Sequence, residues 1–201
     1  MTLTSLRFWV IAVLSLLVAL VSWRFLVFGV ELSMPFMAHH MEPRALALYA
    51  HIGVAPVALA IMPVQFSARI RLGRPVLHRW LGRIYAMAIL ISGVAGLSLA
   101  INSSAGVLAA TGFGLLAVLW LITTARAVWL AMKRRIAEHQ VWMVRSAALT
   151  FAAVTLRLYL PLLTAAFGFD TGYPPVAWLC WVPNLIVAEW WLARRRVRRS
   201  A

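Results

Sequence analysis

The sequence is poor in acidic residues and has almost no cysteine. It carries only 5 Asp and Glu against 19 Lys and Arg, and charged residues make up 12% of its 201 residues. Soluble domains are about 25% charged, so this shortage of charge excludes an ordinary water-exposed surface. The single cysteine, Cys180, cannot form an intrachain disulfide and lacks the spaced partners of a thiolate metal site.

Motifs of soluble enzymes are also missing. The sequence has no glycine loop that would cradle phosphates, no nucleophile elbow, no zinc-protease helix and no paired carboxylates. The basic residues fall in short clusters between apolar runs rather than on one face of a soluble fold. We therefore expect no nucleic-acid partner.

Apolar residues are abundant, at 64% of the chain, and the mean hydropathy is +0.89. A helix of about 20 apolar residues crosses the hydrocarbon core of a bilayer. Six stretches reach this length and are separated by short loops, which predicts a single all-α transmembrane domain over residues 1–201. The predicted spans are residues 8–30, 45–66, 78–101, 105–131, 141–168 and 175–193.

The loops between these spans alternate in charge. Basic segments lie at 69–74, 133–135 and 194–199, whereas Glu31, Glu42 and Asp170 lie in the alternate loops. Since Lys and Arg stay on the cytoplasmic side, this pattern predicts a protein of the inner (cytoplasmic) membrane with both termini in the cytoplasm. We expect the arginine tail to lie against the anionic headgroups of the lipid bilayer.

Tryptophans gather near the ends of the predicted spans, as expected for interfacial aromatic belts. These tryptophans are Trp9, Trp80, Trp129, Trp142, Trp178, Trp190 and Trp191.

Several ionisable side chains fall inside the predicted spans, where each costs about 2.5–3.5 kcal/mol on insertion scales. Arg24 and Arg157 are expected towards the outer side, within reach of the acidic loops. On the inner side, Glu189 has two candidate cationic partners, Arg83 and Arg145. These groups either form interhelical ion pairs that fix packing, or bind an anionic group such as a cofactor propionate, a quinone oxygen or a lipid phosphate.

Two of the five histidines, His78 and His139, each open a span that runs from the inner to the outer side. Two imidazoles at equal depth on parallel helices suit the axial ligation of one b-type haem. Gly82, four residues after His78, would leave room for a flat macrocycle. Alternatively, each histidine bonds a loop carbonyl or a headgroup.

In the haem interpretation, neighbouring arginines would pair with the propionates. These arginines are Arg79, Arg83 and Arg145.

His51 lies about two turns into the second span, on a face that also carries Gln65. We expect a hydrogen-bonded interhelical histidine; the alternatives are a pair with Glu42 or His40, or a proton carrier.

The loop before the second span reads Met34-Pro-Phe-Met37-Ala-His39-His40-Met41-Glu42. Thioethers and imidazoles at this density suit a soft metal ion, especially Cu(I). The other interpretation is an ordinary methionine-rich membrane segment.

Three groups of residues carry a family resemblance: Leu77–Tyr85, Glu138–Ser146 with Thr155–Arg157, and the second span with His51-Ile-Gly and Pro63-Val-Gln65-Phe. From about His51 to Arg157 the sequence resembles the membrane proteins grouped as domain of unknown function 2306 (DUF2306). The resemblance implies a multi-pass bacterial membrane protein and supplies no established activity.

More distantly, the arrangement is similar to the cytochrome b561 and ferric-reductase type of haem core. In that core, histidines on spans two and four bind one haem and those on spans three and five bind another. His78 and His139 match the three/five pair and His51 matches span two, while span four has no histidine. The resemblance therefore implies one haem.

Three function classes follow. The first is a b-type haem electron carrier with a redox partner or quinone. The second is a small transporter or lipid-binding protein, with a polar path through His51, Gln65, Arg157 and Glu189. The third is a non-catalytic accessory subunit whose polar pairs hold the bundle together.

Overall fold

The computed structural model describes the backbone of residues 5–200 and the side chains of residues 6–195. All regular structure in this part of the chain is helical, which confirms the predicted all-α class. The chain forms two compact units, Met1–Ser104 and Ala105–Ala201. The prediction of one transmembrane domain stays a prediction.

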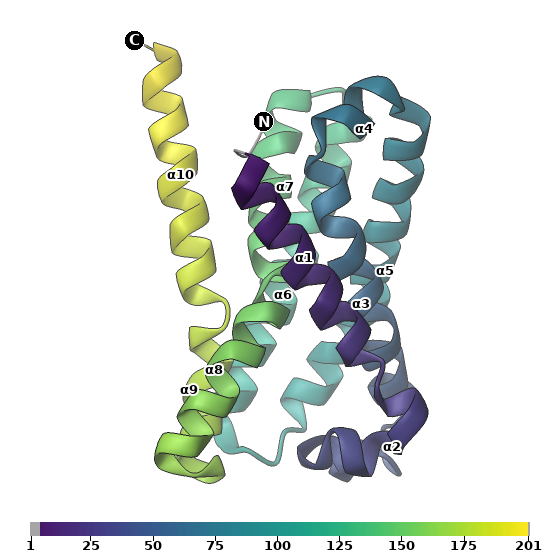
Figure 1. Cartoon of the computed structure of the whole chain (residues 1–201), viewed down its shortest axis with the longest axis vertical. Helices are drawn as coiled ribbons and strands as arrows, with labels where there is room; N and C mark the ends of the chain where they lie inside the picture. Colours follow the sequence, from purple (N-terminus) through teal and green to yellow (C-terminus); the bar gives the residue numbers. More distant parts are fainter. Residues whose placement is uncertain (1–4, 201) are drawn as a thin grey trace. The chain divides into compact units, whose positions relative to one another are not determined.

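The first unit is built around two long helices that lie side by side, α3 (Ala45–Phe66) and α5 (Pro75–Ile101) (Figure 1). Helix α1 (Ser5–Ser22) packs on α3, and the short α4 (Ala68–Gly73) joins the adjacent ends of α3 and α5. Pro75 begins α5, at a position where the missing backbone N–H is not needed.

The first predicted span, 8–30, is not one straight helix. The chain breaks at Trp23 and Arg24, and α2 (Phe25–Ser33) leaves at 78° to the helix before it. The Nε1 of Trp23 donates to the carbonyl of Gly53 on α3, and Arg24 donates to the Ser33 carbonyl, 2.5 Å away. The bend thus gives a charged side chain a carbonyl partner at the end of α2, where helix carbonyls lack intrahelical donors.

A 3₁₀ helix, η1 (Pro35–His40), follows α2 and leads into α3. A buried apolar cluster lies beside it, formed by Phe25, Val30, Met34, Leu48, Ile52 and Leu99.

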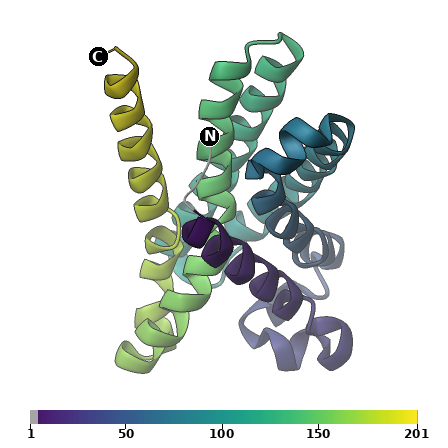
Figure 2. The ribbon, with the colours of Figure 1, turned by 45° about the horizontal axis from the view of Figure 1, so that its top comes forward.

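The second unit contains α6 (Gly106–Met132), α7 (Ile136–Thr150), α8 (Ala152–Phe167), α9 (Phe169–Leu179) and α10 (Val182–Ser200). Helices α6 and α7 form a hairpin, and both views show them side by side (Figures 1 and 2). Helix α8 packs on α9, α9 also packs on α6, and α10 contacts α7. Gly112 permits the close approach of α6 to α9, because a Cβ there would lie 2.9 Å from the carbonyl oxygen of Ala177.

Five helical stretches of the described chain are long and apolar enough to cross a membrane, or six if the bent pair α1–α2 counts as one. The five are Ala45–Phe66, Pro75–Ile101, Gly106–Met132, Ile136–Phe167 and Phe169–Arg195. They correspond to five predicted spans. Three of them begin three to six residues earlier than predicted, as the bounds show, because the polar turns before the apolar residues are also helical.

Candidate functional site

His51 on α3 is joined to α5. Its Nδ1–H donates to the carbonyl of Ser92, 2.8 Å away, and the ring lies against Gly96, where a Cβ would come within 2.8 Å of Nδ1. The predicted interhelical hydrogen bond is confirmed, and Gly96 is the residue that lets the imidazole approach the helix.

His139 stands one turn into α7. Its Nδ1–H donates to the carbonyl of Ala127 on α6, 2.8 Å away. The lone pair of the neutral ring therefore lies on Nε2. This agrees with one alternative from the sequence, a bond to a carbonyl, although the acceptor belongs to a helix and not to a loop.

Gly82 on α5 faces α3. A Cβ at Gly82 would lie 3.4 Å from Oε1 of Gln65, so the space predicted for a macrocycle is bordered by this amide. Gln65 is 7% exposed, and its Nε2 has no hydrogen-bond partner. His78 lies four residues before Gly82, on the same side of α5.

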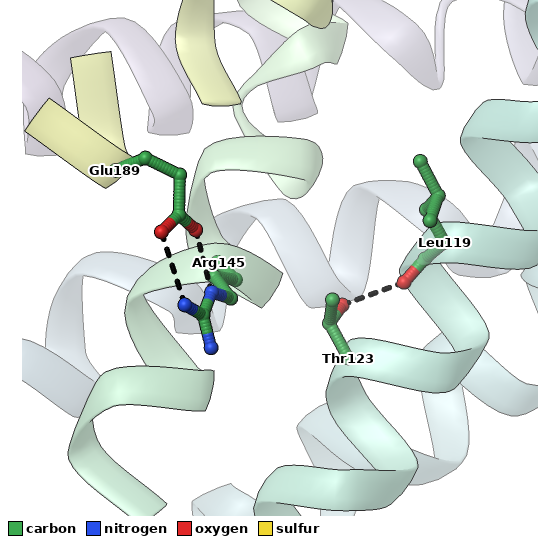
Figure 3. A network of polar contacts seen from close by, with 4 residues as sticks. All are labelled: Leu119, Thr123, Arg145 and Glu189. Atoms are coloured by element: carbon green, nitrogen blue, oxygen red, sulfur yellow. Dashed lines mark hydrogen bonds and ion pairs between the residues drawn. The ribbon is translucent and has the colours of Figure 1, made fainter. Parts of the chain in front are cut away.

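Two charged side chains of the second unit, Arg145 and Glu189, form an ion pair. Arg145 on α7 meets Glu189 on α10 through two hydrogen bonds, Nε to Oε1 at 2.5 Å and Nη2 to Oε2 at 3.0 Å (Figure 3). The guanidinium also lies 4.5 Å from the ring centre of Trp142. Of the two cations predicted as partners of Glu189, the structure shows Arg145 in that role.

The other arginines singled out in the sequence differ in their contacts and their exposure. Arg83 lies 4.9 Å from the ring centre of Trp80, and Arg79 is exposed. On α8, Arg157 donates to the carbonyl of Ala153, 2.9 Å away. Arg24 bonds the carbonyl of Ser33, as described above, in place of the acidic loop side chains expected from the sequence.

A buried polar network between α6 and α7 was not predicted. Thr124 and Ser146 share a hydrogen bond of 2.7 Å, and Trp120 donates to the hydroxyl of Thr150, 2.9 Å away. Such bonds hold helices together in apolar surroundings. The sequence carried a signal for them, because Ser146 and Thr150 are four residues apart, as are Trp120 and Thr124.

Of the two histidines in the loop before α3, one is buried and the other is exposed. His40 is 2% exposed, whereas His39 is exposed, and their ring centres are 3.8 Å apart. Burial, and to a lesser degree the neighbouring His39 and Arg44, lower the pKa of His40 to about 4. Its Nδ1 has no hydrogen-bond partner.

No three side chains of His, Cys, Asp or Glu come together as a metal site within residues 6–195. The side chains of the predicted lipid-facing tail at 196–199 lie outside the described residues.

Within the described residues, the five or six apolar helices of membrane-spanning length are typical of a multi-pass membrane protein. The family described as predicted membrane protein (DUF2306) matches residues 48–192. The chain belongs to this family, as its His51–Arg157 region predicts. Neither a curated protein nor a solved structure matches the chain.

Proposed function

We propose that the protein is a membrane electron carrier that binds one b-type haem, with His139 as an axial ligand. The observation that supports this proposal is the hydrogen bond from His139 Nδ1–H to the Ala127 carbonyl. Ligating histidines usually donate the other ring N–H to a carbonyl or carboxylate, which fixes the tautomer and raises the basicity of the ligating nitrogen. The imidazole of His139 therefore has the tautomer that an iron ligand needs.

The second axial ligand in this proposal is His78, and this choice rests on the sequence. The predicted spans that these residues begin run in the same direction, and each histidine is the fourth residue of its helix, α5 or α7.

Among the predicted propionate partners, Arg79 and Arg83 fit that role best. Arg145 is already paired with Glu189. In contrast, Arg79 is exposed, and the contact described above for Arg83 is with the face of Trp80. A bound haem would supply one-electron chemistry. The chain would hold the iron through imidazole nitrogens and tune its potential through nearby positive charge.

The visible spectrum of the protein purified in mild detergent tests this proposal. We expect a Soret band and, after dithionite reduction, sharp α and β bands. His139→Ala and His78→Ala should each abolish haem retention, whereas His39→Ala, a change on the exposed loop, should leave the spectrum unchanged. A protein that stays colourless when haem is supplied during expression, or alanine variants that retain full haem, would contradict the proposal.

One set of observations favours a second candidate, a non-catalytic accessory subunit. His51 is bonded to the Ser92 carbonyl, and Arg145 and Glu189 neutralise each other. Polar groups satisfied in this way support a purely structural role in the bundle. The transporter interpretation needs Glu189 to face a polar path, and its pairing with Arg145 argues against that use.

We further propose that both termini face the cytoplasm and that the inner surface contacts anionic lipid. Guanidiniums lie over tryptophan rings in several pairs near the predicted inner ends of the spans, among them Arg83 on Trp80, Arg126 on Trp129 and Arg194 on Trp190, at 4.9, 4.4 and 3.7 Å. Such pairs combine an interfacial aromatic ring with a charge that attracts headgroup phosphates.

A further inference from the structure

Met34, Met37 and His40 are spaced three residues apart at and within η1. A 3₁₀ helix has three residues per turn, so side chains three apart are eclipsed. Met34 precedes η1, Met37 lies in its first turn and His40 is its last residue, a spacing of three at each step. The backbone follows this period, since the N–H of Met37 donates to the carbonyl of Met34, 2.8 Å away.

The methionine side chains are held by the apolar cluster of the first unit. Met34 is 7% exposed and belongs to that cluster, and Met37 and Met41 pack against it. Packing of this kind fixes the directions of otherwise flexible thioethers. Hydrophobic packing alone would account for the methionines.

Hydrophobic packing does not account for His40. The side chain is 2% exposed, and its Nδ1 is buried without a hydrogen-bond partner among the described residues. A buried polar atom left in this state costs about 1–3 kcal/mol. A buried nitrogen with a free hydrogen-bonding position calls for a water or an ion next to it.

We propose that Met34, Met37 and His40 bind one Cu(I) ion. Two thioethers and one imidazole are soft, uncharged donors, and this set selects Cu(I) over divalent cations that prefer carboxylates or water. Because the ion carries a single charge, this set of neutral donors needs no anionic ligand beside it. Met41, which follows His40 and packs on the same cluster, is placed to serve as a further thioether donor.

Two charged side chains follow η1. Arg44 donates a hydrogen bond to the Asn102 side chain, 2.7 Å in length. Glu42 is exposed. In the proposed orientation the loop lies on the outer side of the membrane, so the ion would come from outside the cytoplasm. This site is separate from the proposed haem and does not depend on it.

Anaerobic titration with Cu(I), in competition with a chromophoric Cu(I) chelator, tests the site on the full chain in detergent. We expect one Cu(I) per chain, with Ag(I) competing for the site and Zn(II) failing to displace it. Met37→Leu keeps the volume of the side chain and removes the sulfur, so it should weaken Cu(I) binding at least tenfold while the thermal midpoint stays unchanged.

Met87→Leu is the matched control, because Met87 lies exposed on α5. It should bind Cu(I) as the wild type does. His40→Ala should also bind Cu(I) more weakly. If His40→Ala fails to fold, Met37→Leu still tests the site. Absence of stoichiometric binding, equal Cu(I) affinity of Met37→Leu and the wild type, or stronger binding of Zn(II) than of Cu(I) would each overturn the proposal.

Discussion

At the scale of single residues, Gly96 shows how a missing side chain positions a polar one. The ring of His51 lies 2.8 Å from the position that a Cβ on Gly96 would take, and the same ring donates to the Ser92 carbonyl one turn earlier on α5. The glycine therefore determines where His51 can lie, and the carbonyl determines its tautomer.

Gly96→Ala should destabilise the protein. The added Cβ would lie 2.8 Å from Nδ1 and would displace the ring from its hydrogen bond. Overpacking of this kind costs about 1–3 kcal/mol, more than the roughly 0.5–1 kcal/mol that alanine gains over glycine in a helix. A lower thermal midpoint in detergent, followed by circular dichroism, would show the loss.

Gly53→Ala is the matched control, because a Cβ at this helical position on α3 has no neighbour within 4 Å. Its thermal midpoint should be equal to or above that of the wild type. If both alanine variants melt alike, the close approach of His51 to Gly96 is not a determinant of stability.

At the scale of elements, α10 is joined to α7 by the pair Arg145–Glu189. Glu189→Gln keeps the shape of the side chain and removes its charge, so the thermal midpoint should fall. Exposed pairs contribute about 0.2–1 kcal/mol. We expect a value near the upper end here, because the Arg145 side chain is 19% exposed, while Glu189 is 46% exposed.

The pair Arg135–Glu138 provides the comparison. It has the same two-bond geometry, but it lies within one turn and both side chains are about half exposed, at 49% and 47%. Glu138→Gln should therefore lower the midpoint less than Glu189→Gln. A double-mutant cycle with Arg145→Met would isolate the pairwise contribution, and a coupling near zero would contradict the expectation.

The sequence predicted the helices of this protein better than their contacts. Span 45–66 agrees with α3 at both ends, because apolar length alone decides where a bilayer-crossing helix can lie. The bend at Trp23 was not predictable, since it depends on the Gly53 carbonyl of another helix. For Glu189 the sequence left two candidate partners, Arg83 and Arg145, because few charges lie inside the predicted spans. The acceptors of His51 and His139 are backbone carbonyls, which composition does not reveal.

At the scale of the whole molecule, the arrangement of charge predicts which loops face the cytoplasm. The turn between α6 and α7 contains Lys133, and the turn between α5 and α6 contains the uncharged Ser104. In a Cys180→Ser background, a membrane-impermeant maleimide should label Lys133→Cys only in inside-out vesicles and Ser104→Cys only in right-side-out vesicles. The reverse pattern would place the termini outside.

The 78° bend after α1 has a mechanical consequence. Helix α1 has 18 residues and is therefore about 27 Å long, close to the thickness of the hydrocarbon core. When α1 stands across the bilayer, α2 runs nearly along its surface, and Leu26, Val27 and Leu32 are each more than 70% exposed. Because α2 leads directly into η1, a change in bilayer thickness that tilts α1 would also move the segment that carries Met37 and His40.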